Sequence, residues 1–318
     1  MRRHTQFMLR LPTLVAVIVV LLVFFPAPAL AWGPLTHVHF GNDILNHLAV
    51  LTPFVAKLLR DHRLDYLYGC IAADHIVGKN LAPYYAHCHN WKVAFKLLKD
   101  AWTPGQKACA YGFLSHLAAD VIAHNFFVPF KMVQSFPART AKHTYWELRF
   151  DQFVEPGTWL VSKEIARHDN SENDALLATS LSKTLFSYRT GKRLFASAML
   201  FTRLKRWRGM MAYIGRRSPW PLVPAEVDRL KRMTIDNVLS ILIDVEEARC
   251  VSGDPVGARN LKISEQLRHR LKALRRGKKL VPETTPVLTQ LFEEPFRDSI
   301  YSTFEAPDLA PLLVNARD

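Results

Sequence analysis

Apolar residues recur along much of this chain at the three- to four-residue spacing that marks one face of a helix. The alternation of apolar and polar residues that is typical of half-buried strands is scarce, and no internal repeat occurs. The chain is therefore predicted to be all-α, a bundle of several helices. The predicted helical stretches are residues 42–59, 91–102, 107–127, 144–154, 224–249 and 258–276, with one or two more basic helices within residues 173–208. We expect the proline-rich tail, residues 282–311, to be loop with short helical pieces.

The first 31 residues carry a different pattern. Three arginines precede an almost unbroken apolar run over residues 13–25, and the sequence Ala29-Leu30-Ala31 follows. A membrane-spanning helix needs about 20 apolar residues, so this run is short for a span and typical of a secretory signal peptide cleaved after Ala31. We therefore expect an exported chain, secreted or periplasmic, that begins at Trp32. The alternative is an uncleaved N-terminal segment that anchors the chain to a membrane.

The chain is strongly basic, with 42 Lys and Arg against 28 Asp and Glu. Cleavage after residue 31 removes three arginines and leaves 287 residues with a net charge of +11. A cationic surface favours anionic partners such as phospholipid headgroups or nucleic acid, although a solvated surface without such a partner has the same composition. The four cysteines are not spaced as a disulfide framework, and their disulfide state stays open.

The residues that carry candidate chemistry lie in the first half, and three of them share a helix face. His116, Asp120 and His124 are spaced four residues apart in an otherwise apolar segment, so on a helix they point the same way. An unpaired carboxylate buried between two imidazoles would be costly, and a divalent cation would stabilise all three groups. The spacing therefore predicts a metal site on this helix.

Other candidate ligands lie around this segment. His143 and Glu147 form another pair four residues apart, and two such pairs on facing helices can build a metal cluster inside a bundle. Asp74 follows a glycine and small residues at an expected helix end, where its carboxylate could ligate a metal and accept a proton from bound water. The further histidines are His37, His87 and His89. Nitrogen and oxygen ligands suit zinc, with manganese or iron as alternatives.

Together these residues resemble the bacterial zinc-dependent phospholipase C family, which is related to the S1/P1-type nucleases. The resemblance covers roughly residues 32–154. In that family the mature chain begins with tryptophan. An aspartate, a histidine about fifteen residues later, a His-x3-Asp helix, another histidine and a final His-x3-Glu/Asp pair follow. Asp74 and His89 are fifteen residues apart, which favours His89 over His87.

The resemblance implies a bundle that encloses three zinc ions and hydrolyses phosphodiesters. One ion would be held by Asp74, His89, His116 and Asp120, a second by His124, His143 and Glu147, and a third by the amino terminus of Trp32, His37 and Asp120. Water activated by zinc would attack phosphorus, and Asp74 would orient or deprotonate that water. The chain departs from the family at one point, because only three residues separate Asp120 from His124 where the family usually has more.

We therefore expect a secreted zinc-dependent phospholipase C whose substrate is a phospholipid or a membrane surface. One alternative is a single-strand nuclease of the S1/P1 type, with nucleic acid as its substrate. Another is a non-enzymatic, membrane-associated metal-binding protein. No protein partner is inferred. The aromatic candidates to contact a headgroup or stack on a base are Tyr84, Tyr85, Phe126 and Tyr145, each of which is as readily a core residue.

The chain divides into three parts on this interpretation. Residues 1–31 are the signal peptide, and residues 32–160 are a catalytic core of the zinc-dependent phospholipase C type. Residues 161–318 form a helical C-terminal region of unknown role that packs on the core.

Overall fold

The computed structural model describes residues 32–75, 88–138, 143–180, 192, 205–281 and 284–314. Over these residues the predicted all-α fold is confirmed, and the β structure is limited to an isolated bridge between Leu280 and Leu313. Within the described part of the chain, no helix is both long and apolar enough to cross a membrane. The predicted signal peptide lies outside the described residues.

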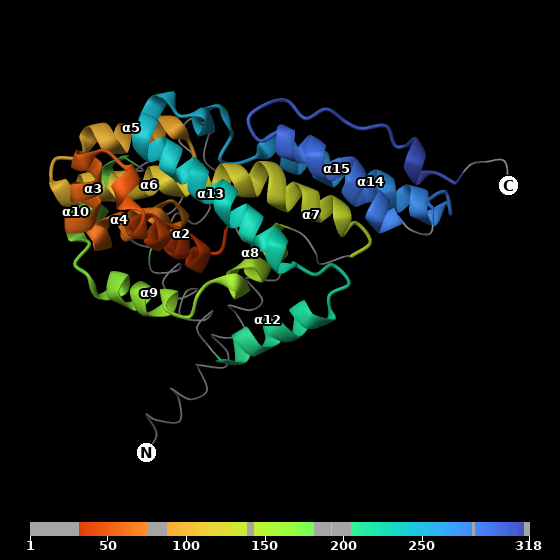
Figure 1. The fold of residues 1–318 in the computed structure, drawn as a ribbon, viewed down its shortest axis with the longest axis horizontal. Helices are drawn as coiled ribbons and strands as arrows, with labels where there is room; N and C mark the ends of the chain where they lie inside the picture. Colours follow the sequence, from red (N-terminus) through yellow and green to blue (C-terminus); the bar gives the residue numbers. More distant parts are fainter. Residues whose placement is uncertain are drawn as a thin grey trace, which may run out of the picture.

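The elements of the described residues follow one another as helices (Figure 1). The first half contains α2 (Pro34–Asn46), η1 (Leu48–Val50), α3 (Pro53–Asp61), α4 (Arg63–Ala72), η2 (Ala73–His75), α5 (Trp91–Asp100), α6 (Pro104–Ile122), the π-helix η5 (Ala123–Phe127), α7 (Val128–Gln134), α8 (His143–Phe150) and η6 (Asp151–Phe153). The second half contains α9 (Thr158–Arg167), α10 (Ser171–Ser180), α12 (Lys205–Arg217), α13 (Pro224–Asp244), η7 (Val245–Glu247), η8 (Arg249–Ser252), α14 (Ala258–Arg276), α15 (Thr284–Asp298) and η9 (Ala310–Leu312).

The predicted helix over residues 42–59 is interrupted, so that prediction is wrong. α2 ends at Asn46, and α3 begins seven residues later at Pro53. Pro53 has no N–H to donate to a preceding turn, so it starts a helix more readily than it continues one. Thr52 caps the new helix, because its hydroxyl accepts a hydrogen bond from Val55 N at 3.4 Å.

α6 is the central helix of the fold. A reciprocal capping box fixes its start: Gln106 N donates to Thr103 Oγ1 at 3.2 Å, and Thr103 N donates to Gln106 Oε1 at 3.4 Å. From Ala108 to Ile122 every residue of α6 is buried, and α4, α5 and α13 all pack on it. A polar side chain on this part of α6 therefore points into the protein, whichever face it occupies.

Glycines bring α4 and α6 into backbone contact. A Cβ atom on Gly112 would lie 2.0 Å from the carbonyl oxygen of Tyr66, and one on Gly69 would lie 2.0 Å from the carbonyl oxygen of Cys109. Both contacts are far shorter than van der Waals distance, so neither position accepts a larger residue without separation of the helices. This close approach fixes α4 against α6.

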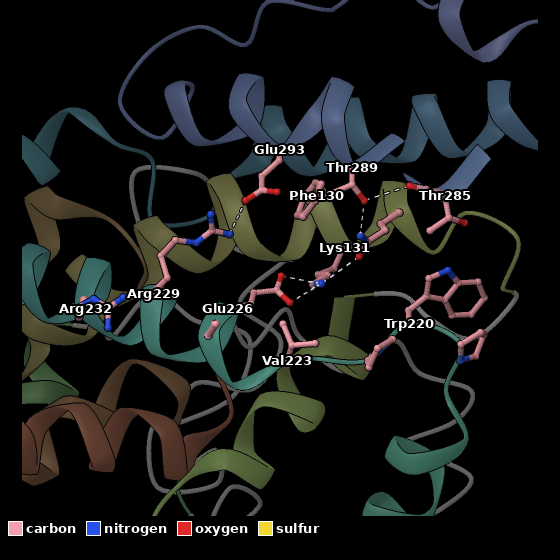
Figure 2. Close-up of a pocket in the computed structure, with 14 residues that line it drawn as sticks. Phe130, Lys131, Trp220, Val223, Glu226, Arg229, Arg232, Thr285, Thr289 and Glu293 are labelled. Carbon is pink, nitrogen blue, oxygen red and sulfur yellow. Dashed lines mark hydrogen bonds and ion pairs between the residues drawn. The ribbon is translucent and has the colours of Figure 1, made fainter. Parts of the chain in front are cut away.

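The C-terminal helices cover α6 and α7. α13 packs across α6, and α14 and α15 pack on α7 (Figure 1). The seam with α7 is partly polar: buried Lys131 lies 2.7 Å from Glu226 of α13, and Gln134 Nε2 donates to Thr289 Oγ1 of α15 at 2.8 Å (Figure 2). These contacts line a cavity of about 570 Å³. The apolar core is one cluster whose members run from Trp32 to Leu312.

The tail contains a full helix, α15, where the sequence pattern predicts loop with short helical pieces, so this prediction is also wrong. Leu288, Phe292 and Phe296 are four residues apart, and all three are fully buried on one face of α15. Burial of this apolar face stabilises the helix more than Pro295, near its end, destabilises it.

Candidate metal centre

His116 and Asp120 lie one turn apart in the buried part of α6, as their spacing predicts. His116 Nδ1 is hydrogen-bonded to the carbonyl of Cys70 on α4 at 2.9 Å. Because a carbonyl only accepts, Nδ1 carries the proton and Nε2 keeps its lone pair. That Nε2 atom lies 3.3 Å from Asp120 Oδ2. The contact between α4 and α6 thus sets both the tautomer and the direction of the imidazole.

Asp74 and His89 approach the same point from the ends of other elements. Asp74 lies in η2, directly after α4, and His89 lies just before α5. His89 Nε2 is 3.1 Å from Asp120 Oδ2 and 3.5 Å from Asp74 Oδ1. Asp74, His89 and His116 each offer a ligand atom within 4.8 Å of the others. His87, the alternative to His89, lies outside the described residues.

α2 brings His37 to the other side of the same carboxylate. His37 Nε2 lies 3.2 Å from Asp120 Oδ1, and the imidazole stacks on that of His116 with ring centroids 3.9 Å apart. Asp120 therefore presents Oδ1 to His37 and Oδ2 to His89 and His116. A carboxylate placed in this way can bridge two metal ions.

Trp32 packs beside this turn of α6. Its indole is fully buried, stacks on Phe127 at 5.0 Å between ring centroids, and donates from Nε1 to Ala119 O at 2.9 Å. The start of α2 is fixed by Asp151, whose Oδ1 accepts hydrogen bonds from Thr36 N at 3.1 Å and from Thr36 Oγ1 at 2.5 Å. These contacts hold residues 32–36 against α6, the helix that carries Asp120.

His124 belongs to the π-helix that follows α6. The helix predicted over residues 107–127 is thus α-helical only as far as Ile122. A π-turn holds more residues than an α-turn, so it shifts the helical register at the turn that carries His124. His124, His143 and Glu147 offer ligand atoms within 4.8 Å of one another, and His143 Nε2 lies 2.7 Å from Glu147 Oε1.

Burial favours the neutral form of His37 and of His124, whereas Asp120 is held in its ionised form. Burial, and then His143, lower the pKa of His124 to about 3, while burial and then His116 lower the pKa of His37. Burial opposes ionisation of Asp120, but His116 and His37 outweigh it and hold the pKa of this carboxyl well below its ordinary value. A metal ion binds these same protonation states.

Buried polar atoms test whether a metal would fit these residues. His37 Nε2, His124 Nε2 and both carboxylate oxygens of Asp120 are buried without a hydrogen-bond partner in the described part of the chain. A buried polar atom left unsatisfied costs about 1–3 kcal/mol, and more if it is charged. Divalent cations would satisfy these atoms together, and an imidazole and carboxylate donor set fits zinc.

All nine ligand candidates from the sequence lie within the described residues. Eight of them fall into three groups: His37, His116 and Asp120; Asp74, His89 and His116; and His124, His143 and Glu147. Trp32 was proposed to ligate through its amino terminus, and it lies beside these groups on α6. Sequence reasoning missed the carbonyls of Cys70 and Pro255, which accept from His116 and His124. Every residue has a main-chain carbonyl, so the residue types in a sequence do not indicate which carbonyl will accept a hydrogen bond from a histidine.

The structure describes two of the four aromatic candidates for a headgroup contact, Phe126 and Tyr145. Phe126 is buried and stacks on Phe130, so it serves the core. Tyr145 is half-buried, and its hydroxyl accepts from Arg149 at 2.7 Å and donates to Ser218 at 3.2 Å. Tyr84 and Tyr85 lie outside the described residues.

A comparison with known families identifies this arrangement. Residues 36–191 match the model of the zinc dependent phospholipase C family. Residues 36–191 of the chain therefore form a domain of this family. It is therefore a zinc-dependent phosphodiester hydrolase of the phospholipase C type, and the resemblance drawn from the ligand spacing is confirmed. The matched region of this phospholipase C contains every ligand candidate except Trp32. No curated protein and no solved structure matches the chain.

Proposed function

We propose that this phospholipase C hydrolyses the headgroup phosphodiester of phospholipids at a membrane surface after export. The observation that supports this most strongly is the convergence of three ligand groups around α6 and the π-helix that follows it, within the region that matches the family. The net charge of +11 after cleavage also suits a substrate presented on an anionic surface.

The proposed ligands follow the three groups. Asp120 would bridge two zinc ions, because its two oxygens face different sets of histidines. The first ion would be held by Asp74, His89, His116 and Asp120, the second by His124, His143 and Glu147, and the third by His37, Asp120 and the amino terminus of Trp32.

The side chains of the site would then perform distinct tasks. Bound zinc supplies a water of lowered pKa and positive charge for phosphate oxygens. Asp74, at the end of η2, would orient the attacking water or accept its proton. The carbonyls of Cys70 and Pro255 would keep the ligating nitrogens of His116 and His124 unprotonated. Hydrolysis would release diacylglycerol and a phosphorylated headgroup.

Removal of the signal peptide during export would also create one of the proposed zinc ligands, the amino terminus of Trp32. Cleavage after Ala31 would create an α-amino group on Trp32, whose indole donates to Ala119 O on the ligand-bearing helix α6. A chain that retains Ala31 carries an amide at this position, and an amide nitrogen is a poor metal ligand. We expect such a chain to bind one zinc fewer than a chain that starts at Trp32, as measured by metal analysis of both proteins. Equal zinc content would exclude the amino terminus as a ligand.

The proposed substrate is tested with the purified chain that starts at Trp32. We expect zinc-loaded protein to release diacylglycerol from phosphatidylcholine vesicles, to lose this activity on chelation, and to regain it when zinc is restored. Release of nucleotides from single-stranded DNA without diacylglycerol would instead identify a nuclease of the related type. Zinc-loaded protein inactive on both substrates would support a metal-binding role without catalysis.

A further inference from the structure

The π-helix that carries His124 accepts a hydrogen bond from the C-terminal half of the chain. Pro129, in the first turn of α7, has no N–H to donate to the carbonyls of the preceding turn. Asn260 of α14 donates to one of these carbonyls, with its Nδ2 atom 2.8 Å from Asn125 O. A side chain from the C-terminal half therefore completes the hydrogen bonding of this turn.

Residues 253–257, which connect η8 to α14, make further contacts with the same turn. The carbonyl of Pro255 accepts from His124 Nδ1 at 2.5 Å, and the carbonyl of Asp254 accepts from Asn125 Nδ2 at 2.8 Å. The segment thus holds two successive side chains of the π-helix. Because the Pro255 carbonyl can only accept, the proton of His124 must reside on Nδ1, and Nε2 keeps its lone pair.

The segment is also built to lie close to His124. Gly257 has a left-handed φ of +60°, and a Cβ atom there would lie 2.4 Å from the carbonyl oxygen of His124. Only glycine accepts both the dihedral angle and the close approach. The Asp254 side chain folds the segment, since its two oxygens accept from Val256 N and Ala258 N, both at 3.0 Å.

A last contact ties the segment to the other ligand group. Trp91 Nε1, in the first turn of α5, donates to the carbonyl of Gly253 at 2.9 Å. Trp91 follows His89 by two residues. Three successive carbonyls, those of residues 253–255, therefore accept hydrogen bonds from side chains that are, or lie within two residues of, a metal ligand candidate.

We propose that residues 253–257 are a positioning segment for His124, fixing its tautomer and turning Nε2 toward His143 and Glu147. The inference rests on the proposed role of His124 as a zinc ligand. It gives the C-terminal half a role in the metal centre, although these residues lie outside the region that matches the family. The imidazole is held by a carbonyl 131 residues further along the chain.

The test compares zinc binding by Gly257→Ala and by a matched control, Gly277→Ala. Gly277 ends the same helix, α14, with φ −76° and no neighbouring atom closer than 3.6 Å to an added Cβ. Zinc-free chains are titrated with zinc against a chromophoric chelator. We expect the affinity of one zinc to fall roughly 10- to 100-fold in Gly257→Ala, the loss typical of removed support for a ligand, and the other affinities to persist. Gly277→Ala should match the wild type.

A second variant acts without a steric clash. Asp254→Ala removes both side-chain acceptors that fold the segment, whereas Asp254→Asn retains one oxygen for Val256 N. We expect Asp254→Ala to weaken the same zinc and Asp254→Asn to recover part of the affinity. Should Gly257→Ala lose its helical circular dichroism, Asp254→Ala decides the question.

Two results would overturn the inference. One is wild-type affinity for every zinc in the folded Gly257→Ala and Asp254→Ala variants. The other is an equal loss of affinity for all zinc ions, which would mean that the segment supports the whole bundle. A wild-type chain that binds zinc normally but cleaves no phospholipid would refute the proposed substrate and leave this comparison intact, because zinc binding is measured without turnover.

Discussion

Asp120 is the side chain on which the centre depends most, because its two oxygens face different ligand groups. Oδ1 lies 3.2 Å from His37 Nε2, while Oδ2 lies 3.1 Å from His89 Nε2 and 3.3 Å from His116 Nε2. Loss of one carboxylate oxygen should therefore affect two metal positions at once.

The variant Asp120→Asn tests this position at nearly constant volume. One oxygen becomes an amide nitrogen, which donates hydrogen bonds and does not ligate zinc. We expect zinc content to fall by at least one ion per chain, and phospholipid hydrolysis to fall by more than about 100-fold. Metal analysis and an activity assay measure the two effects. Asp100→Asn, at an exposed ion pair with Lys96, should change neither. A full zinc complement in Asp120→Asn would contradict the bridging role.

At this scale the sequence predicted ligand candidates that the fold brings together, because side-chain chemistry and spacing are both visible in it. The four-residue steps from His116 to Asp120 and from His143 to Glu147 survive folding unchanged, since each pair lies on one helix. The orienting carbonyls of Cys70 and Pro255 were not predictable. Every residue has a carbonyl, so only the fold decides which one meets an imidazole.

The π-helix between α6 and α7 is the element-scale feature with most effect on the site. The hydrophobic pattern predicts a helix through residue 127 but does not distinguish an α-turn from a π-turn, because every residue from 123 to 127 is buried. Pro129 was the available signal, since a proline inside a helical stretch disturbs the hydrogen bonds of the preceding turn. Local pattern therefore predicted where helices lie better than where they change register.

The close approach of α4 and α6 is a second element-scale feature, tested by Gly112→Ala. The added methyl group would lie 2.0 Å from Tyr66 O, so the helices must separate. Overpacking of this kind typically costs about 1–3 kcal/mol of unfolding free energy, and the separation should also move Cys70 O away from His116. Urea unfolding measures the change.

The control for this variant is Gly209→Ala. Gly209 lies on α12, is exposed, and has no atom within 4 Å of an added Cβ. Alanine is favoured over glycine inside a helix by about 1 kcal/mol, so this change should leave stability unchanged or raise it. Equal unfolding midpoints for Gly112→Ala and the wild type would show that α4 can move away from α6 without loss of unfolding free energy.

Across the whole molecule, the C-terminal half is joined to the ligand-bearing half by polar as well as apolar contacts. Lys131 on α7 is 2% exposed, and its ammonium is held by Glu226 on α13 and by Gln134 on its own helix (Figure 2). Burial lowers the pKa of Lys131, so the ion pair is what keeps this charge acceptable inside the protein. None of this was predictable from the sequence, because the partners lie 95 residues apart.

The variant Glu226→Ala should destabilise the protein strongly. Removal of one partner of a buried ion pair leaves an uncompensated charge and typically costs about 3–5 kcal/mol of unfolding free energy. Replacement of both partners, Lys131→Met with Glu226→Leu, should recover most of this loss. Arg297→Ala, which breaks an exposed pair with Glu294, should cost less than about 1 kcal/mol. Urea unfolding of the four proteins gives the ranking, and a Glu226→Ala loss as small as that of Arg297→Ala would contradict it.

The distance along the chain between His124 and Pro255 has a consequence for the order of events in synthesis. A growing chain makes the His124 imidazole 131 residues before the carbonyl that orients it. In the proposed centre the amino terminus of Trp32 would arise only when the leader is removed. The proposed centre would thus be completed by the last-made half of the chain and by a processing step, so an unfinished or unprocessed chain would hold an incomplete zinc cluster. Hydrolysis of the membranes of the producing cell would thereby be restrained until synthesis and processing are finished.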